Sequence, residues 1–224
     1  MSYYPVLIHL EGKKVVVVGG GTVAERKIHT LLEYNADVHI VCQELTPALS
    51  KCVKKGTIKF LGHEFRDNYL DGAFMVIAAT DDPLLNRQVS AKAREKGLLI
   101  NAVDQPSDCN FVVPSVLRRG DFLIAVSTSG KSPAFAKKVR EELEKRFGEE
   151  YESFLILMGH LREKILSQGL TRDENRRIFQ ELVNSRILDA IAKHDWNEVA
   201  TILNTIIIEA HVTSNDVINY LKTG

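Results

Sequence analysis

The feature that most constrains the fold is the segment from residue 14 to residue 27, KVVVVGGGTVAERK. Its valines predict a buried strand that runs into three consecutive glycines and then into a helix beginning near Thr22. Gly19, Gly21 and Ala24 occupy the small-residue positions of the G-x-G-x-x-G/A pattern. These positions permit a tight turn, close approach of the backbone to a pyrophosphate, and close packing of helix on strand. The segment therefore predicts a dinucleotide-binding turn.

The start of this predicted helix supplies the groups that would hold the phosphates. The backbone N–H groups around Gly21, Thr22, Val23 and Ala24 have no partner within the helix, and the helix dipole is positive at this end. Glycine is also favoured in any tight turn between a strand and a helix. A purely structural turn is therefore the alternative interpretation.

The composition is that of an ordinary globular protein. The chain has 224 residues, 45% of them apolar, so it can bury one large core or two smaller ones. Its formal net charge is zero, so the composition shows no excess of basic residues of the kind that binds nucleic acid. No apolar run approaches the roughly 20 residues that span a bilayer, and residues 1–11 lack a signal-peptide layout. The three cysteines include no C-x-x-C pair. We expect a cytoplasmic protein with reduced cysteines and no membrane partner.

Strands and helices alternate through the first half of the chain. This spacing predicts a Rossmann-like, doubly wound parallel sheet of the α/β class, with ligands at the carboxyl ends of its strands. The expected strands are residues 15–18, 38–41, 58–61, 74–79 and 98–100, and the expected helices between them begin near residues 22, 47 and 83.

The alternation ends after the fifth strand. Residues 111–116 and 122–127 predict two antiparallel strands, and a charged helix follows from residue 132 to about residue 147. Beyond Gly148 the pattern is all helical, in segments 151–168, 173–193, 196–210 and 214–222. We therefore expect three parts: residues 1–113, 114–148 and 149–224.

The end of the second strand is the expected site of the adenosine ribose. A dinucleotide fold usually places an acid there, about 20 residues beyond the glycines. In this chain the first acidic residue lies about two positions beyond the usual place at the strand end. Gln43 and Glu44 are the candidates to accept hydrogen bonds from the ribose hydroxyls. No arginine stands there to bind a 2′-phosphate, so the sequence favours NAD over NADP.

Thr80 and Asp81, at the end of the fourth strand, are expected to line the nicotinamide side. The next residue, Asp82, precedes Pro83 and has a simpler interpretation as a helix N-cap.

Asn101 and Asp104 follow the fifth strand, where the sheet would present its edge to a substrate. A carboxylate at Asp104 is well placed to act as a general base, because an apolar wall raises a carboxyl pKa toward the working range. The alternative is a turn-forming aspartate before Gln105 and Pro106.

A cluster of hydroxyl groups and one lysine precedes the charged helix. A helix start with such side chains suits a carboxylate or a phosphate, although hydroxyls at helix starts are commonly caps. The candidates are Ser127, Thr128, Ser129, Lys131 and Ser132. The seven histidines show no i, i+4 pair, so we expect no resident metal site.

These motifs, in one register, resemble the precorrin-2 dehydrogenase and sirohydrochlorin ferrochelatase family, which includes the N-terminal half of sirohaem synthase. The matching stretches are residues 5–6, 18–27, 77–82, 101–104, 111–115 and 125–133. The resemblance implies NAD-dependent oxidation of precorrin-2, a tetrapyrrole, to sirohydrochlorin, with Asp104 as the catalytic carboxylate.

The resemblance also implies partners. Some family members insert Fe2+ to form sirohaem, and the family forms homodimers through the segment that matches Phe111 to Phe147. Residues 114–148 would then be a dimerisation segment between an NAD-binding domain and a helical C-terminal domain. The alternative from another functional class is an NAD-sensing regulatory module with the same fold, because a fold does not fix a function.

Overall fold

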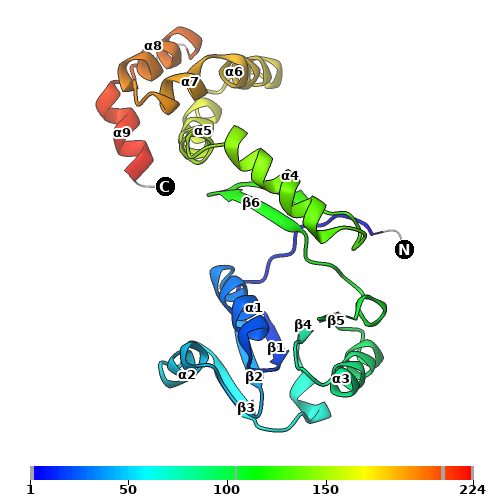
Figure 1. Ribbon diagram of the computed structural model, residues 1–224. Coiled ribbons are helices and arrows are strands. Elements are labelled where there is room, and N and C mark those ends of the chain that lie inside the picture. The colour runs from blue at the N-terminus through cyan, green and yellow to red at the C-terminus, as the bar shows by residue number, and fades with distance from the viewer. Residues whose placement is uncertain (1–2, 104, 208–209, 223–224) are drawn as a thin grey trace. The chain divides into compact units, whose positions relative to one another are not determined.

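The computed structural model describes residues 3–103, 105–207 and 210–222 (Figure 1). The chain divides into two compact units. The first contains Met1–Val113 and Ser129–Lys131, and the second contains Pro114–Thr128 and Ser132–Gly224. The three-part division expected from the sequence stays a prediction.

The first unit is built on a five-stranded parallel sheet in the order β3-β2-β1-β4-β5. The strands are β1 (Lys14–Val18), β2 (Asp37–Val41), β3 (Lys59–Gly62), β4 (Met75–Ala78) and β5 (Leu99–Ala102). The helices are α1 (Thr22–Glu33), α2 (Pro47–Lys54) and α3 (Pro83–Glu95), with short 3-10 turns η1 (Asp67–Leu70) and η2 (Pro106–Asp108). The predicted α/β class is confirmed. The strand order reverses beside β1, which is where such sheets collect ligands.

Both faces of this sheet are covered, which explains the unbroken valine run. Val15 and Val17 belong to the apolar cluster that includes residues of α1 and α2, whereas Val16 and Val18 belong to the cluster that includes residues of α3. All four are buried. A strand covered on both faces needs apolar side chains at every position.

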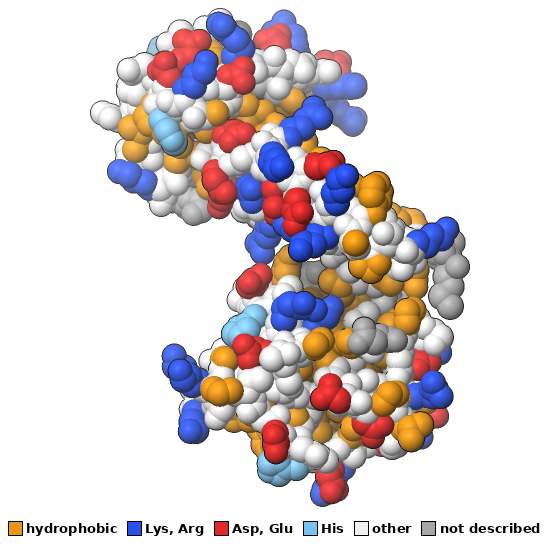
Figure 2. Space-filling view, in the orientation of Figure 1, with side chains coloured by type: hydrophobic (Ala, Val, Ile, Leu, Met, Phe, Trp, Pro, Cys, Tyr) orange, Lys and Arg blue, Asp and Glu red, His pale blue; other side chains and the backbone are white. Residues whose placement is uncertain are grey.

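The second unit begins with an antiparallel hairpin of β6 (Ser115–Arg119) and β7 (Phe122–Val126). The strand expected at residues 111–116 thus starts later, because Phe111 packs against the core of the first unit and Pro114 has no N–H for a ladder. The helix α4 (Pro133–Arg146) follows. Basic and acidic side chains lie side by side on its surface (Figure 2). Lys137 and Glu141, four residues apart, form an ion pair on this helix.

In the part of the second unit that the structure describes, five further helices pack around a separate apolar core. They are α5 (Glu150–Leu166), α6 (Arg172–Asn184), α7 (Ile187–Ala192), α8 (Trp196–Ile206) and α9 (Ser214–Lys222). The single helix expected at residues 173–193 is wrong, because Ser185 adopts an extended backbone and its hydroxyl bonds the Leu182 carbonyl oxygen and the Ile187 N–H. None of the described helices is long and apolar enough to cross a membrane.

Candidate nucleotide and substrate site

Gly19 is where the turn after β1 comes closest to its neighbours. Its φ is 125°, and a Cβ placed there would lie 2.1 Å from the Ala79 carbonyl oxygen. Its N–H donates to the Val41 carbonyl oxygen at 2.8 Å. Gly19 therefore joins the ends of β1, β2 and β4, and only glycine fits both the conformation and the space.

Gly20 and Gly21 serve different purposes. A Cβ on Gly20 would lie 2.0 Å from the Glu44 carbonyl oxygen and 2.7 Å from Cys42 Sγ, so Gly20 provides close packing against the segment after β2. A Cβ on Gly21 would meet nothing within 4 Å. The sequence pattern leaves Gly20 at an unspecified position and therefore missed it. The space around Gly21 leaves room for a ligand to approach the backbone, as the pattern predicts.

The start of α1 fits an anionic ligand. Gly21 is the N-cap, and no side chain caps this helix start. Thr22 and Val23 are exposed, whereas Ala24 is fully buried and packs the helix on the sheet. The first N–H groups of α1 are thus presented without a competing side-chain acceptor, as a pyrophosphate requires.

A cleft of about 920 Å³ opens at the carboxyl ends of the strands. It brings together eight of the predicted cofactor residues: Gly19, Gly21, Thr22, Val23, Gln43, Glu44, Thr80 and Asp81. The whole lining consists of residues 18–23, 41–46, 63–65, 79–82, 85 and 88. The segment 63–65 was missed by the sequence analysis, because a turn after a third strand carries no recognisable pattern.

Thr46 fixes the β2 side of the cleft. Its hydroxyl donates to the Glu25 carboxylate in the first turn of α1, and its N–H donates to the Gly20 carbonyl oxygen at 3.1 Å. The same hydroxyl accepts from the Leu49 N–H at 3.3 Å and caps α2. The glycine turn and the wall that carries Gln43 and Glu44 are therefore held as one unit.

Asn86 fixes the opposite side of the cleft. This buried α3 residue accepts from the Thr80 N–H at 3.1 Å and donates from its amide to the Thr80 carbonyl oxygen at 2.9 Å. The Thr80 hydroxyl also donates to Asn86 Oδ1 at 2.8 Å. Asp82 caps α3 by accepting from the N–H groups of Leu84 and Leu85, so its interpretation as a cap is confirmed.

We expect Asn86→Ala to destabilise the protein by about 2 kcal/mol, because two backbone groups of Thr80 lose their partners in a buried site. It should also raise the KM for the cofactor, since the loop it holds lines the cleft. Ser90→Ala is the matched control, because Ser90 is buried in the same helix and its hydroxyl has no partner among the described residues. Urea unfolding checks both variants, and equal losses of stability would contradict the assignment.

The loop after β5 carries the predicted catalytic position. We call residues 103 and 105–111, the part that the structure describes, the post-β5 loop. Asp104 itself lies outside the described residues. Asn101 is half-buried and donates from its side-chain amide to the Phe111 carbonyl oxygen at 3.2 Å, so it supports the far end of this loop.

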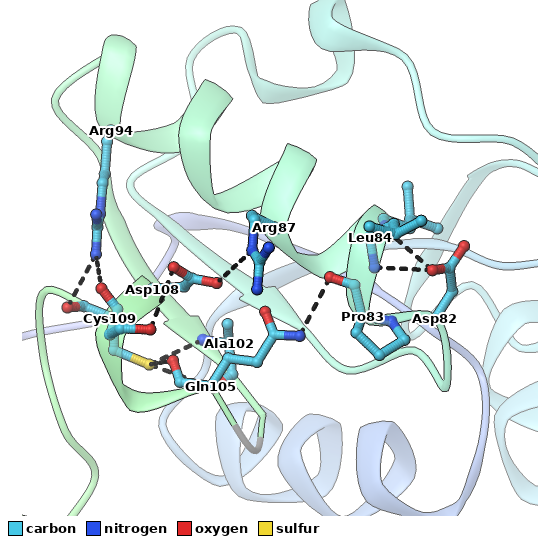
Figure 3. A network of polar contacts seen from close by, with 11 residues as sticks. Asp82, Pro83, Leu84, Arg87, Arg94, Ala102, Gln105, Asp108 and Cys109 are labelled. Carbon is cyan, nitrogen blue, oxygen red and sulfur yellow. Dashed lines mark hydrogen bonds and ion pairs between the residues drawn. The ribbon is translucent and has the colours of Figure 1, made fainter.

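Cys109 holds the post-β5 loop from within (Figure 3). Its buried sulfur accepts from the Ala102 N–H at 3.2 Å and donates to the carbonyl oxygens of Ala102 at 3.2 Å and Gln105 at 3.4 Å. Burial raises the pKa of this thiol. A neutral thiol can donate as well as accept, which is what these contacts require.

The helix α3 holds the same loop from outside. Gln105 donates from its side-chain amide to the Pro83 carbonyl oxygen at 3.1 Å, and Arg94 donates to the Ser107 carbonyl oxygen at 2.6 Å. Arg87 lies 3.7 Å from the Asp108 carboxylate. Figure 3 shows that these contacts extend along α3 from its first turn to its last. The post-β5 loop is therefore tied to the helix whose start lines the cleft.

The predicted anion-binding segment forms local caps. Ser132 accepts from the Phe135 N–H at 3.3 Å, and Thr128 accepts from the Ser132 N–H at 3.0 Å. Ser127, Ser129 and Lys131 are exposed. A role of these residues in substrate binding stays a prediction. Among the described residues, no group of three or more His, Cys, Asp or Glu side chains could hold a metal ion.

Two family models match the chain. A putative NAD(P)-binding family matches residues 6–115, and the central part of a sirohaem biosynthesis protein matches residues 119–146. The first model supports a nicotinamide cofactor for this chain, and it includes the glycine turn and the residues that line the cleft. The assignment of the cofactor to this cleft stays a prediction.

Several proteins named siroheme synthase are similar to this chain. The siroheme synthase of Photorhabdus laumondii is 35% identical over 192 residues, which are 86% of this chain and 41% of that protein. The siroheme synthase of Mannheimia succiniciproducens is 38% identical over 186 residues, 83% of this chain and 39% of that protein. This chain therefore spans well under half of these relatives. A solved structure of SirC, a precorrin-2 dehydrogenase, matches with a TM-score of 0.77 and 25% identity, covering 91% of this chain and 98% of that one.

Proposed function

This chain belongs to the precorrin-2 dehydrogenase family of sirohaem biosynthesis, and from this premise we propose that it oxidises precorrin-2 to sirohydrochlorin with NAD+ as the acceptor. One observation carries the proposal. The chain covers 98% of a precorrin-2 dehydrogenase and has, at the carboxyl edge of its sheet, a glycine turn shaped for a dinucleotide.

The choice of NAD over NADP rests on the charge of the cleft. Glu44 follows β2 and is exposed, with Gln43 beside it, where the ribose hydroxyls would lie. Glu64, Asp81 and Asp82 also line the cleft, and its described lining contains no Lys or Arg. A 2′-phosphate would add negative charge to an acidic wall, whereas a free hydroxyl can donate to a carboxylate.

The chemistry divides between the cofactor and the protein. Bound NAD+ supplies a hydride acceptor. The glycine turn and the start of α1 would hold its phosphates, and Thr80 and Asp81 would line the side of the cleft next to the nicotinamide ring. Asp104 would accept the proton that leaves the tetrapyrrole as the hydride is transferred, so that the substrate loses one hydride and one proton, two electrons and two hydrogens in all. Positioning of the two reactants supplies much of the rate.

The same proposal includes the other partners that the resemblance implies. Residues 114–148 form the dimerisation segment of a homodimer, and the exposed Phe135 side chain on α4 supports an apolar contact there. Fe2+ insertion would draw its nitrogen ligands from the macrocycle, so it requires no His or Cys cage in the protein. Asp104 could collect the pyrrole protons in that step too.

The test is to mix purified protein with precorrin-2 and either NAD+ or NADP+. We expect the sirohydrochlorin spectrum to appear with NAD+, accompanied by an equal amount of NADH, and a lower kcat/KM with NADP+. An NAD-sensing module would bind NAD+ without turnover. Binding without turnover would therefore reject the dehydrogenase and retain the cofactor site.

A further inference from the structure

Lys27 occupies a position of α1 that the helical repeat assigns to the core. It follows Ala24 by three residues and precedes Leu31 by four, and both of these side chains are buried. Residues at these spacings share one face of an α-helix. The Lys27 side chain therefore projects from the face of α1 that packs against the rest of the first unit.

The Lys27 ammonium has no compensating partner among the residues that the structure describes. The side chain is half-buried, and it makes no hydrogen bond or ion pair with any residue in the described part of the chain. Burial lowers the pKa of Lys27, and neighbouring Arg26 lowers it further. Desolvating an unpaired ammonium costs free energy, so this lysine weakens the fold until an anion joins it.

The post-β5 loop lies beside this lysine. Val103 and Phe111 pack on the same apolar cluster as the buried residues of α1, and Lys27 lies near enough to Cys109 for each group to influence the pKa of the other. Lys27 thus lies on the side of α1 that faces the end of β5, next to the loop that carries position 104.

The described groups of this loop do not supply the missing anion. Burial raises the pKa of Cys109, and the thiol hydrogen is engaged by backbone carbonyl oxygens. Asp108 is paired with Arg87. An anion that pairs with the Lys27 ammonium must therefore be a group other than Cys109 or Asp108.

The cofactor phosphates are also poorly placed for this role. Lys27 is five residues beyond the first residue of α1, which is about 7.5 Å along the helix axis at 1.5 Å per residue. Phosphates bind at the first N–H groups of a helix, where the dipole effect is confined to the first turn. Lys27 is set back from that point by more than one helical turn.

We propose that Lys27 binds a carboxylate group of the tetrapyrrole substrate. The inference rests on the proposed function, because it is the substrate that brings carboxylates to this end of the sheet. An ammonium–carboxylate contact in a partly desolvated site is a strong, charge-assisted hydrogen bond. The competing interpretations are a lysine that only packs its stem and leads its ammonium to water, and a lysine that pairs with the chain's own Asp104.

The test compares Lys27→Met with Arg26→Met. Methionine keeps the apolar stem of Lys27 and removes the charge, while Arg26 is exposed on the same helix and serves as the matched control. We expect Lys27→Met to raise the KM for precorrin-2, and the Kd for added sirohydrochlorin, by about tenfold, with kcat nearly unchanged. Its melting temperature should equal or exceed that of the wild type, because a half-buried charge without a partner among the described residues is gone. Lys27→Arg should recover part of the affinity.

Three results would overturn this assignment. Unchanged KM and Kd would show that the ammonium only reaches water. A fall in kcat without a change in KM would assign the lysine to Asp104. A loss of stability in Lys27→Met would make the lysine structural. If the wild type itself fails to oxidise precorrin-2, the proposed function fails first, and the sirohydrochlorin titration still reports whether Lys27 binds this class of anion.

Discussion

Gly19→Ala is expected to lose at least about 3 kcal/mol of stability and with it the binding of NAD+. The new Cβ would lie 2.1 Å from the Ala79 carbonyl oxygen, which is backbone and cannot turn aside. The φ of 125° adds strain for any residue with a side chain. Urea unfolding measures the loss of stability, and calorimetric titration with NAD+ measures the loss of binding.

Gly21→Ala is the matched control, two residues further along the same turn. Its Cβ would meet nothing within 4 Å, and its φ of −80° suits alanine. We expect wild-type stability, combined with a Kd for NAD+ raised about tenfold because the methyl group stands where the pyrophosphate approaches. If Gly19→Ala is as stable as Gly21→Ala, the close contact with β4 is not what fixes the turn.

Asp104→Asn is expected to lower kcat for precorrin-2 oxidation by a factor of about 10² to 10⁴, the range for a lost general base. The amide has the size of the carboxylate but cannot accept the proton, so the KM values and the melting temperature should change little. Steady-state NADH formation measures the dehydrogenase, and Fe2+ uptake by sirohydrochlorin measures the second reaction on the same variant.

Asp67→Asn provides the control for the Asp104 variant, because Asp67 is an exposed carboxylate of the same unit on η1, 3.5 Å from Lys92. Its activities should equal those of the wild type. Should Asp104→Asn retain both activities, Asp104 has no part in either reaction, and another base must be sought along the cleft.

The features of this protein that could be predicted are those determined by residues adjacent in the sequence. The valine run, the glycines and the helix after them are adjacent in the sequence, so one segment predicts strand, turn and cofactor contact together. The Asp82-Pro83 pair likewise predicts a helix start, because both residues act within one turn of each other. The parallel sheet follows from the alternation of such segments.

The features that could not be predicted depend on residues that meet only after folding. Gly20 is required because Cys42 and Glu44 come within contact distance of it, more than 20 residues later in the chain. The hydrogen bonds of Asn86 with the Thr80 loop have no sequence signal beyond a polar residue in a helix. The setting of Lys27 depends on which face of α1 meets the post-β5 loop.

A crystal structure with NAD+ bound tests the central claim most directly. We expect the pyrophosphate to lie over the N–H groups of Gly21, Thr22 and Val23, with the adenosine ribose at Glu44 and the nicotinamide ring beside Thr80. Crystals grown or soaked at saturating NAD+ in which this cleft holds no cofactor, or in which NAD+ binds elsewhere on the chain, would contradict it.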